Sequence, residues 1–245
     1  MKVNSAFFGK GKDNLIDCLK SENTLNDEGF CASLSSENKL KKFGFFNEFY
    51  FFDKIDSTNK FLKENSSKLK TPCLIVAKEQ TKGKGKNGAV WFSLKGKSAT
   101  FSMLFDVYAD DIEKIGLLTM CGAVSVAQAI EETGKIKAKC KWPNDVLING
   151  KKVCGILTES EPLGDNMYKV IIGIGVNLRG SRDEFPDELK NDLCVVSELA
   201  GREISDDEFF EKFFKNFTMN FKDFICGNHK NIIKKWEEKV IFKNG

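Results

Sequence analysis

The stretch Lys141-Trp142-Pro143-Asn144-Asp145-Val146-Leu147-Ile148-Asn149-Gly150 decides how the middle of this chain folds. Pro143 lacks a backbone donor and disfavours a helical conformation at Trp142, so the chain bends there. The apolar residues that follow predict a strand, and Asn-Gly is the dipeptide most typical of a two-residue hairpin turn. The stretch therefore predicts a charged bend leading into a β-hairpin, with Lys141 near a strand end. Taken alone, this pattern suits a solvated turn as well as a ligand site.

A second segment upstream alternates glycine and lysine: Gln80-Thr81-Lys82-Gly83-Lys84-Gly85-Lys86-Asn87-Gly88. It follows an apolar run, residues 73–77, that predicts a buried strand. Glycines let the backbone approach a ligand closely, and backbone N–H groups with lysines can form an anion-binding concavity. Trp91, just beyond, offers a flat apolar surface suited to an adenine ring. The Gly-Lys-Ser/Thr ending of a Walker loop is missing, which leaves another anion-binding loop or a flexible basic surface loop.

The remaining patterns predict an α+β domain with a mixed, mostly antiparallel sheet backed by helices. Expected helices cover residues 57–65, 110–133, a Phe-rich stretch beginning at 205, and 228–239, with one short helix at 13–20. Expected strands cover residues 48–55, 73–77, 98–107, 137–141, 146–159 and 167–178. The Phe stripe after residue 205 has helical spacing and indicates core packing.

Composition excludes several function classes. The chain has 245 residues and a net charge of +3, so nothing global points to nucleic acid. No apolar run approaches the ~18 residues of a membrane span, and the start does not match a signal peptide. The eight cysteines lie far apart and His229 is the single histidine, which argues against a zinc site. We therefore expect a cytoplasmic protein with reduced cysteines that binds neither DNA nor membrane.

Taken together and in this order, four blocks resemble the catalytic domain of biotin–protein ligases. They are Asp56-Ser57-Thr58-Asn59, residues 80–91, residues 141–159 and Ile172-Gly173-Ile174-Gly175-Val176-Asn177. The resemblance implies the class II synthetase-like biotin/lipoate ligase fold over residues 47–230. Residues 1–46 would be an N-terminal extension without the winged-helix domain of family members that are repressors. Residues 231–245 would be a short segment that resembles the start of an otherwise missing SH3-like domain.

The resemblance also implies roles for individual residues, with ATP, biotin and Mg²⁺ as ligands. Lys141 and Lys86 would supply catalytic charge, and Asp145 or Glu159 would orient Mg²⁺. The biotin site would contain Ser57, Thr58, Asn59, Gln80, Gly83, Lys84, Gly155 and Gly173. The nucleotide site would contain Lys86, Trp91, Asn144 and Asn177. Gly173 and Gly175 would leave room for a ring system close to the backbone.

The implied reaction is the activation of biotin as biotinyl-5′-AMP, followed by its transfer to a lysine of a biotin carboxyl carrier domain of a carboxylase. A lipoate or octanoate transferase and a non-catalytic biotin or adenylate sensor remain as alternatives, and homodimerisation through a sheet edge stays open. Where the family loop usually has arginines, this chain has Lys84, Lys86, Asn87 and Ala89. Lysine lacks the planar two-pronged geometry that holds phosphate, so we expect weaker retention of the adenylate.

Overall fold

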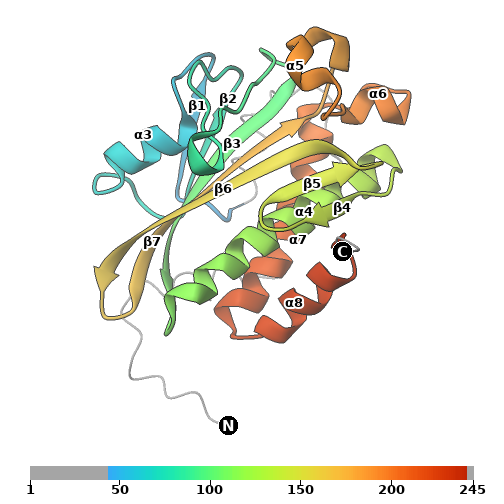
Figure 1. The fold of residues 1–245 in the computed structure, drawn as a ribbon. Helices are drawn as coiled ribbons and strands as arrows, with labels where there is room; N and C mark the ends of the chain where they lie inside the picture. The colour runs from blue at the N-terminus through green and yellow to red at the C-terminus, as the bar shows by residue number, and fades with distance from the viewer. Residues whose placement is uncertain (1–43, 242–245) are drawn as a thin grey trace.

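A seven-stranded sheet forms the centre of the computed structural model, which describes residues 44–241 (Figure 1). Its strand order is β1-β2-β3-β7-β6-β5-β4. The strands are β1 (Glu48–Phe52), β2 (Cys73–Ala77), β3 (Ser98–Tyr108), β4 (Lys139–Lys141), β5 (Asp145–Ile148), β6 (Lys151–Gly164) and β7 (Met167–Asn177). β1 and β2 pair in parallel, and every other pair of neighbouring strands is antiparallel. The predicted α+β class with a mixed, mostly antiparallel sheet is confirmed.

The predicted hairpin joins β5 to β6. Asn149 and Gly150 form its turn with φ values of 51° and 79°, the left-handed conformations that a tight hairpin turn requires. Asp145 pairs with Gly155 across the two strands, and a bulge lies between Val146 and Leu147. The bend before the hairpin contains a cis Trp142–Pro143 peptide bond. The turn fixes the register that brings the start of β6 alongside the end of β5.

Three helices cover one face of the sheet, which we call the helix face: α4 (Gly116–Gly134), α7 (Asp206–Ile225) and α8 (His229–Glu237) (Figure 1). Ser205 caps α7 by accepting a hydrogen bond from the Glu208 backbone N–H. The Phe stripe of α7 is buried against β3, as predicted. The 3₁₀ turn Ile112–Ile115 and α4 together form a segment that is long and apolar enough to cross a membrane. However, 61% of its most apolar 18-residue stretch is buried inside the protein.

The opposite face carries α3 (Thr58–Asn65), and we call it the cavity face. Ser57 caps α3 by accepting a hydrogen bond from the Lys60 backbone N–H. Leu62 packs on Cys73, Ile75, Leu104 and Ile171 of the sheet. This contact fixes the N-terminus of α3 beside the glycine-rich parts of β6 and β7.

Residues near both ends of the described chain pack in the main core. Phe45 and Phe46, expected in the N-terminal extension, are buried in the core between β3 and α7. At the other end, the helix predicted at 228–239 is present as α8, whose Ile232 and Trp236 are buried. The likeness of residues 231–245 to the start of an SH3-like domain stays a prediction. Short elements at Lys86–Gly88, Arg182–Glu184, α5 (Asp187–Lys190) and α6 (Val196–Ala200) are too brief to leave a periodic pattern. The short helix expected at 13–20 lies outside the described residues.

Candidate functional site

The cavity face of the sheet is lined by small residues because side chains alternate along each strand. On β7, Gly173 and Gly175 face the cavity while Ile172 and Ile174 pack on the helix face. On β6, Gly155 occupies the equivalent place. A cavity of about 360 Å³ lies between these strands, the N-terminus of α3, the bend before β5 and residues 80–91. We call residues 80–91 the glycine–lysine loop.

The glycines are required by side chains that lie directly on the strands. A Cβ at Gly175 would overlap the Trp91 indole, and a Cβ at Gly155 would press against its edge. A Cβ at Gly173 would overlap the Asn59 side-chain amide. The sequence predicted space for a ring system above Gly173 and Gly175. In the structure the Trp91 ring lies above Gly175 and the Asn59 amide lies above Gly173.

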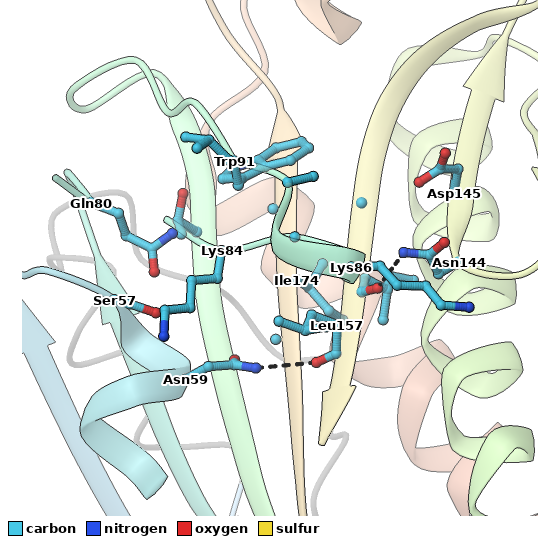
Figure 2. Close-up of a pocket in the computed structure, with 18 of the residues that line it drawn as sticks. Ser57, Asn59, Gln80, Lys84, Lys86, Trp91, Asn144, Asp145, Leu157 and Ile174 are labelled. Carbon is cyan, nitrogen blue, oxygen red and sulfur yellow. Dashed lines mark hydrogen bonds between the residues drawn. The ribbon is translucent and has the colours of Figure 1, made fainter. Parts of the chain in front are cut away.

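The glycine–lysine loop has a defined hairpin-like structure over the cavity (Figure 2). The Trp91 N–H donates to the Gly83 carbonyl at 3.0 Å, and the Gly85 N–H donates to the Ala89 carbonyl at 2.7 Å. Asn87 at the tip has φ 55°, a left-handed conformation that asparagine tolerates. These bonds hold Lys84 and Lys86 above the cavity while Gly83 stays buried at the base of the loop.

Asp56, at the end of the segment before α3, holds the start of this loop. Its carboxylate accepts hydrogen bonds from the Thr81 hydroxyl at 2.9 Å and from the Lys82 ammonium at 3.4 Å. The Lys82 N–H also donates to the Asp56 carbonyl. The bond from Thr81, followed by the bond and charge of Lys82, lowers the pKa of Asp56 below its usual 3.8. An ionised Asp56 thus ties the loop to the N-terminus of α3.

One end of the cavity is lined by neutral hydrogen-bonding side chains. Gln80 Oε1 accepts hydrogen bonds from the Thr58 N–H at 2.7 Å and from the Thr58 hydroxyl at 2.9 Å. The Ser102 hydroxyl lies 2.6 Å from both Thr58 Oγ1 and Asn59 Oδ1. Asn59 Nδ2 donates to the Leu157 carbonyl (Figure 2) and to the Glu159 carboxylate. Since Gln80 Oε1 is already bonded, its amide NH₂ remains to donate to a ligand.

The other end is cationic, with Lys86 (Figure 2) and Lys152 beside one carboxylate, Asp145. A third lysine, Lys84, also lines the cavity. Lys152 Nζ lies 2.7 Å from Asp145 Oδ1 and 5.9 Å from the centroid of the Trp91 ring. Lys84 and Lys86 form no ion pair with any described residue. In Figure 2, Lys84 extends toward Ser57, and Lys86 lies on the side of Asn144. Unpaired cations in a concave site favour an anionic ligand.

Most of the residues that the sequence analysis selected meet at this cavity. Ser57, Thr58, Asn59, Gln80, Lys84, Lys86, Trp91, Asn144, Asp145, Gly155 and Gly173 all line it. Gly83 is buried at the base of the glycine–lysine loop, and the Glu159 carboxylate accepts a hydrogen bond from Asn59 Nδ2. Asn177 does not line the cavity. It is buried at the end of β7, where its side-chain amide donates a hydrogen bond to the Cys194 carbonyl at 3.3 Å.

Lys141 is not brought to the cavity, whereas Lys152, which the sequence analysis did not select, is. Lys141 is exposed on the short strand β4, beyond β5. Lys152 stands at the start of β6, paired with Leu147 of β5. The hairpin turn could have predicted this position of Lys152, because a two-residue turn at 149–150 folds Lys152 back beside β5, close to Asp145.

Comparison with known proteins agrees with this arrangement. The model of the biotin/lipoate A/B protein ligase family matches residues 51–177. The bifunctional ligase/repressor BirA of Bacillus subtilis (strain 168) is 37% identical over 170 residues, which cover 69% of this chain and 51% of the relative. The biotin–[acetyl-CoA-carboxylase] ligase of Paracoccus denitrificans is 34% identical over 132 residues, covering 52% and 53% of the two chains.

Solved structures extend the likeness to the fold. The biotin protein ligase from Aquifex aeolicus in complex with biotin and ATP matches with a TM-score of 0.69 and 32% identity, covering 80% of each chain. The present chain spans about half the length of the curated relatives it matches. Since the family model covers more than half of the chain and the fold agrees, the predicted resemblance is confirmed, and the chain belongs to the biotin/lipoate A/B protein ligase family.

Proposed function

We propose that this protein activates biotin with ATP as biotinyl-5′-AMP and transfers biotin to a lysine of a biotin carboxyl carrier domain. One observation carries the proposal: a single cavity joins an uncharged polar end at Thr58 and Gln80 to a cationic end at Lys86 and Lys152. Biotin has the matching polarity, with a neutral cyclic urea at one end and a carboxylate at the other. The Aquifex aeolicus ligase structure is described as a complex with biotin and ATP, which supports the same choice of ligands.

The first step joins two anions. A carboxylate oxygen of biotin attacks the α-phosphorus of ATP, the bond to the β-phosphate oxygen breaks, and pyrophosphate leaves. Positive charge fixed in advance lowers this barrier because it needs no reorganisation as the charges approach. Lys152 and Lys86 are placed to supply that charge, so the geometry favours Lys152 over Lys141 for the role first expected of Lys141.

The second step transfers the acyl group. The neutral amine of the carrier lysine attacks the acyl carbon, the bond to the phosphate oxygen breaks, AMP leaves, and the amine loses a proton. The glycine–lysine loop would keep water from the anhydride until the carrier arrives. The Paracoccus denitrificans relative is named for acetyl-CoA-carboxylase, which supports a carboxylase carrier domain as the partner.

The cavity offers one carboxylate that could bind a magnesium ion together with ATP. Mg²⁺ at nucleotide sites is held by one or two carboxylates, phosphate oxygens and water. Asp145 is the carboxylate among the described cavity-lining residues, and the Asn144 amide beside it is fixed by a bond to the Ile156 carbonyl at 2.9 Å. When bound, the ion would neutralise phosphate charge. Asp145 would then be shared between the ion and Lys152.

The test is a transfer assay with the full chain, biotin, Mg-ATP and a purified carrier domain, followed by intact mass spectrometry. We expect one biotin-sized mass gain on the carrier, which disappears without ATP or when the target lysine is replaced by arginine. Lipoate and octanoate in place of biotin are the control for acid selectivity. Transfer of lipoate but not biotin would point to the lipoate branch of the family, and biotin binding without transfer would point to a sensor.

A further inference from the structure

Thr100 is a cavity residue to which the proposed mechanism gives no role. It lies on β3, lines the cavity and is 2% exposed. Its hydroxyl has no hydrogen-bond partner among the described residues. Ser102, two residues further along the same strand and on the same face, is also buried but lies 2.6 Å from both Thr58 Oγ1 and Asn59 Oδ1. The two hydroxyls therefore differ: one is hydrogen-bonded within the protein, and the other has no partner among the described residues.

A second unpartnered polar atom lies at the same level of the sheet. Thr100 pairs with Gly175 of β7, and the Trp91 indole lies directly on Gly175. Trp91 Nε1 is buried and has no partner among the described residues. Cross-strand neighbours on one face are separated by about 5 Å. The Thr100 hydroxyl and the Trp91 N–H are therefore two donors at one position on the cavity wall.

Leaving such groups unpaired is costly, since a buried polar group without a partner loses its hydration and gains nothing. Most buried polar side-chain atoms in proteins have partners, so two exceptions facing one cavity call for an occupant. The position also tells which part of a ligand is involved. Thr100 lies about 7 Å along β3 from Ser102, away from the uncharged end and beside the indole over which Lys152 lies.

We infer that Thr100 is a substrate-binding residue, whose hydroxyl joins Trp91 Nε1 in donating hydrogen bonds to the carboxylate oxygen of the biotin tail. Both groups are donors, and a carboxylate oxygen can accept two hydrogen bonds. The Lys152 ammonium adds charge on the same side of the cavity. This assignment rests on the proposed function, because it names the part of biotin that this wall of the cavity holds.

The test measures biotin affinity by calorimetry for the wild type, Thr100→Val and Thr100→Ser. Valine keeps the shape and removes the hydroxyl, whereas serine keeps the hydroxyl. We expect Thr100→Val to weaken biotin binding at least about tenfold, the effect of losing a hydrogen bond to a charged group. Thr100→Ser should stay within about twofold. The alcohol analogue of biotin, which lacks the anionic oxygen, should bind wild type and Thr100→Val within about twofold of each other.

Thermal unfolding without ligand is the folding control. Thr100→Val should melt at or above the wild-type temperature, because the hydroxyl it loses makes no bond in the protein. Equal biotin affinity of Thr100→Val and wild type would overturn the inference, as would equal weakening for biotin and the alcohol. A clear loss of thermal stability would also overturn it by showing an internal partner. If the wild type itself binds no biotin, the proposed function fails instead.

Discussion

The two faces of β7 differ in role: one packs in the core, and the other borders the cavity. On the helix face, Val170, Ile172, Ile174 and Val176 are buried in the main core with α4 and α7. On the cavity face, Gly173 and Gly175 carry no side chain, and Asn59 and Trp91 from other segments lie on them. Successive residues of one strand thus have different roles. Large apolar side chains stabilise the sheet from one side, and their absence on the other side leaves room for a ligand.

This contrast predicts that substitutions on the two faces have different consequences. On the helix face, a lost methylene removes buried apolar contact and costs free energy of unfolding. On the cavity face, an added methylene or a lost charge changes ligand binding or chemistry more than folding.

Replacing Lys152 by methionine should lower the rate of biotinyl-adenylate formation by about 10² to 10³, the typical cost of losing one fixed group that stabilises a transition state. Lys141→Met is the matched control on the neighbouring exposed strand, and its rate should remain within about twofold of wild type. Single-turnover formation of biotinyl-AMP from labelled biotin measures both. A large loss in Lys141→Met with normal Lys152→Met would restore the first assignment and refute the present one.

Gly175→Ala and Ile172→Ala compare the two faces of β7. The alanine Cβ at 175 would overlap the Trp91 indole, and displacing that ring from the cavity wall should weaken biotin binding about 10- to 100-fold. Ile172, which is buried in the main core and does not line the cavity, should on replacement by alanine lower the free energy of unfolding by about 2–5 kcal/mol and leave the affinity of the folded protein nearly unchanged. Denaturant unfolding and calorimetry separate the two quantities. Similar profiles for both variants would contradict the division between faces.

Arginine in place of both Lys84 and Lys86 should slow the release of biotinyl-AMP by a factor of about 3 to 10, because the guanidinium holds phosphate with two parallel hydrogen bonds. Stopped-flow displacement of labelled adenylate measures the release rate. Lys82→Arg is the control, since Lys82 is tied to Asp56 at the base of the loop. Equal release rates for wild type and the double variant would show that the lysines already hold the adenylate as well as arginines do.

The smallest expected effect concerns Asp56 and pH. Its pKa is lowered in the folded protein, chiefly by the Thr81 and Lys82 hydrogen bonds. Its stabilising contribution is therefore complete above the ordinary value of 3.8 and is lost as the pH falls through the lowered pKa. Asp56→Asn should melt slightly below wild type at pH 7, and the difference should shrink as the pH approaches 3. A constant difference across this range would exclude titration of Asp56 as its source.

Much of the fold could be predicted because its signals are local. The Asn149-Gly150 turn, the Phe stripe of α7 and the apolar run of β2 each specify one element, and the structure contains all three. Most of the cavity residues followed from motifs as well. The main difference concerns Lys141 and Lys152, which lie on neighbouring segments of one motif block: the sequence favoured the first, and the structure brings the second to the cavity. Which lysine faces a ligand depends on strand pairing and on the bulge after Val146, and neither is visible in the spacing of lysines.

Thr100 and Trp91 illustrate a second limit of the sequence. The place of the indole on Gly175 depends on how the glycine–lysine loop folds back over β6 and β7, a contact between segments about 84 residues apart. An unpartnered hydroxyl can be identified only once every neighbour is in place. Local patterns identified the loop and the strands, while their mutual arrangement had to come from the structure.

The most direct test of the account is biotin-dependent exchange of labelled pyrophosphate into ATP by the wild-type chain without any carrier. Reversal of the adenylation step is the sole source of such exchange in this scheme. The account predicts exchange that requires biotin and that Lys152→Met slows by about 10² to 10³ while the variant keeps its fold. Exchange that is absent with biotin bound, or that proceeds without biotin, would contradict the assignment of the cavity face as the adenylation site.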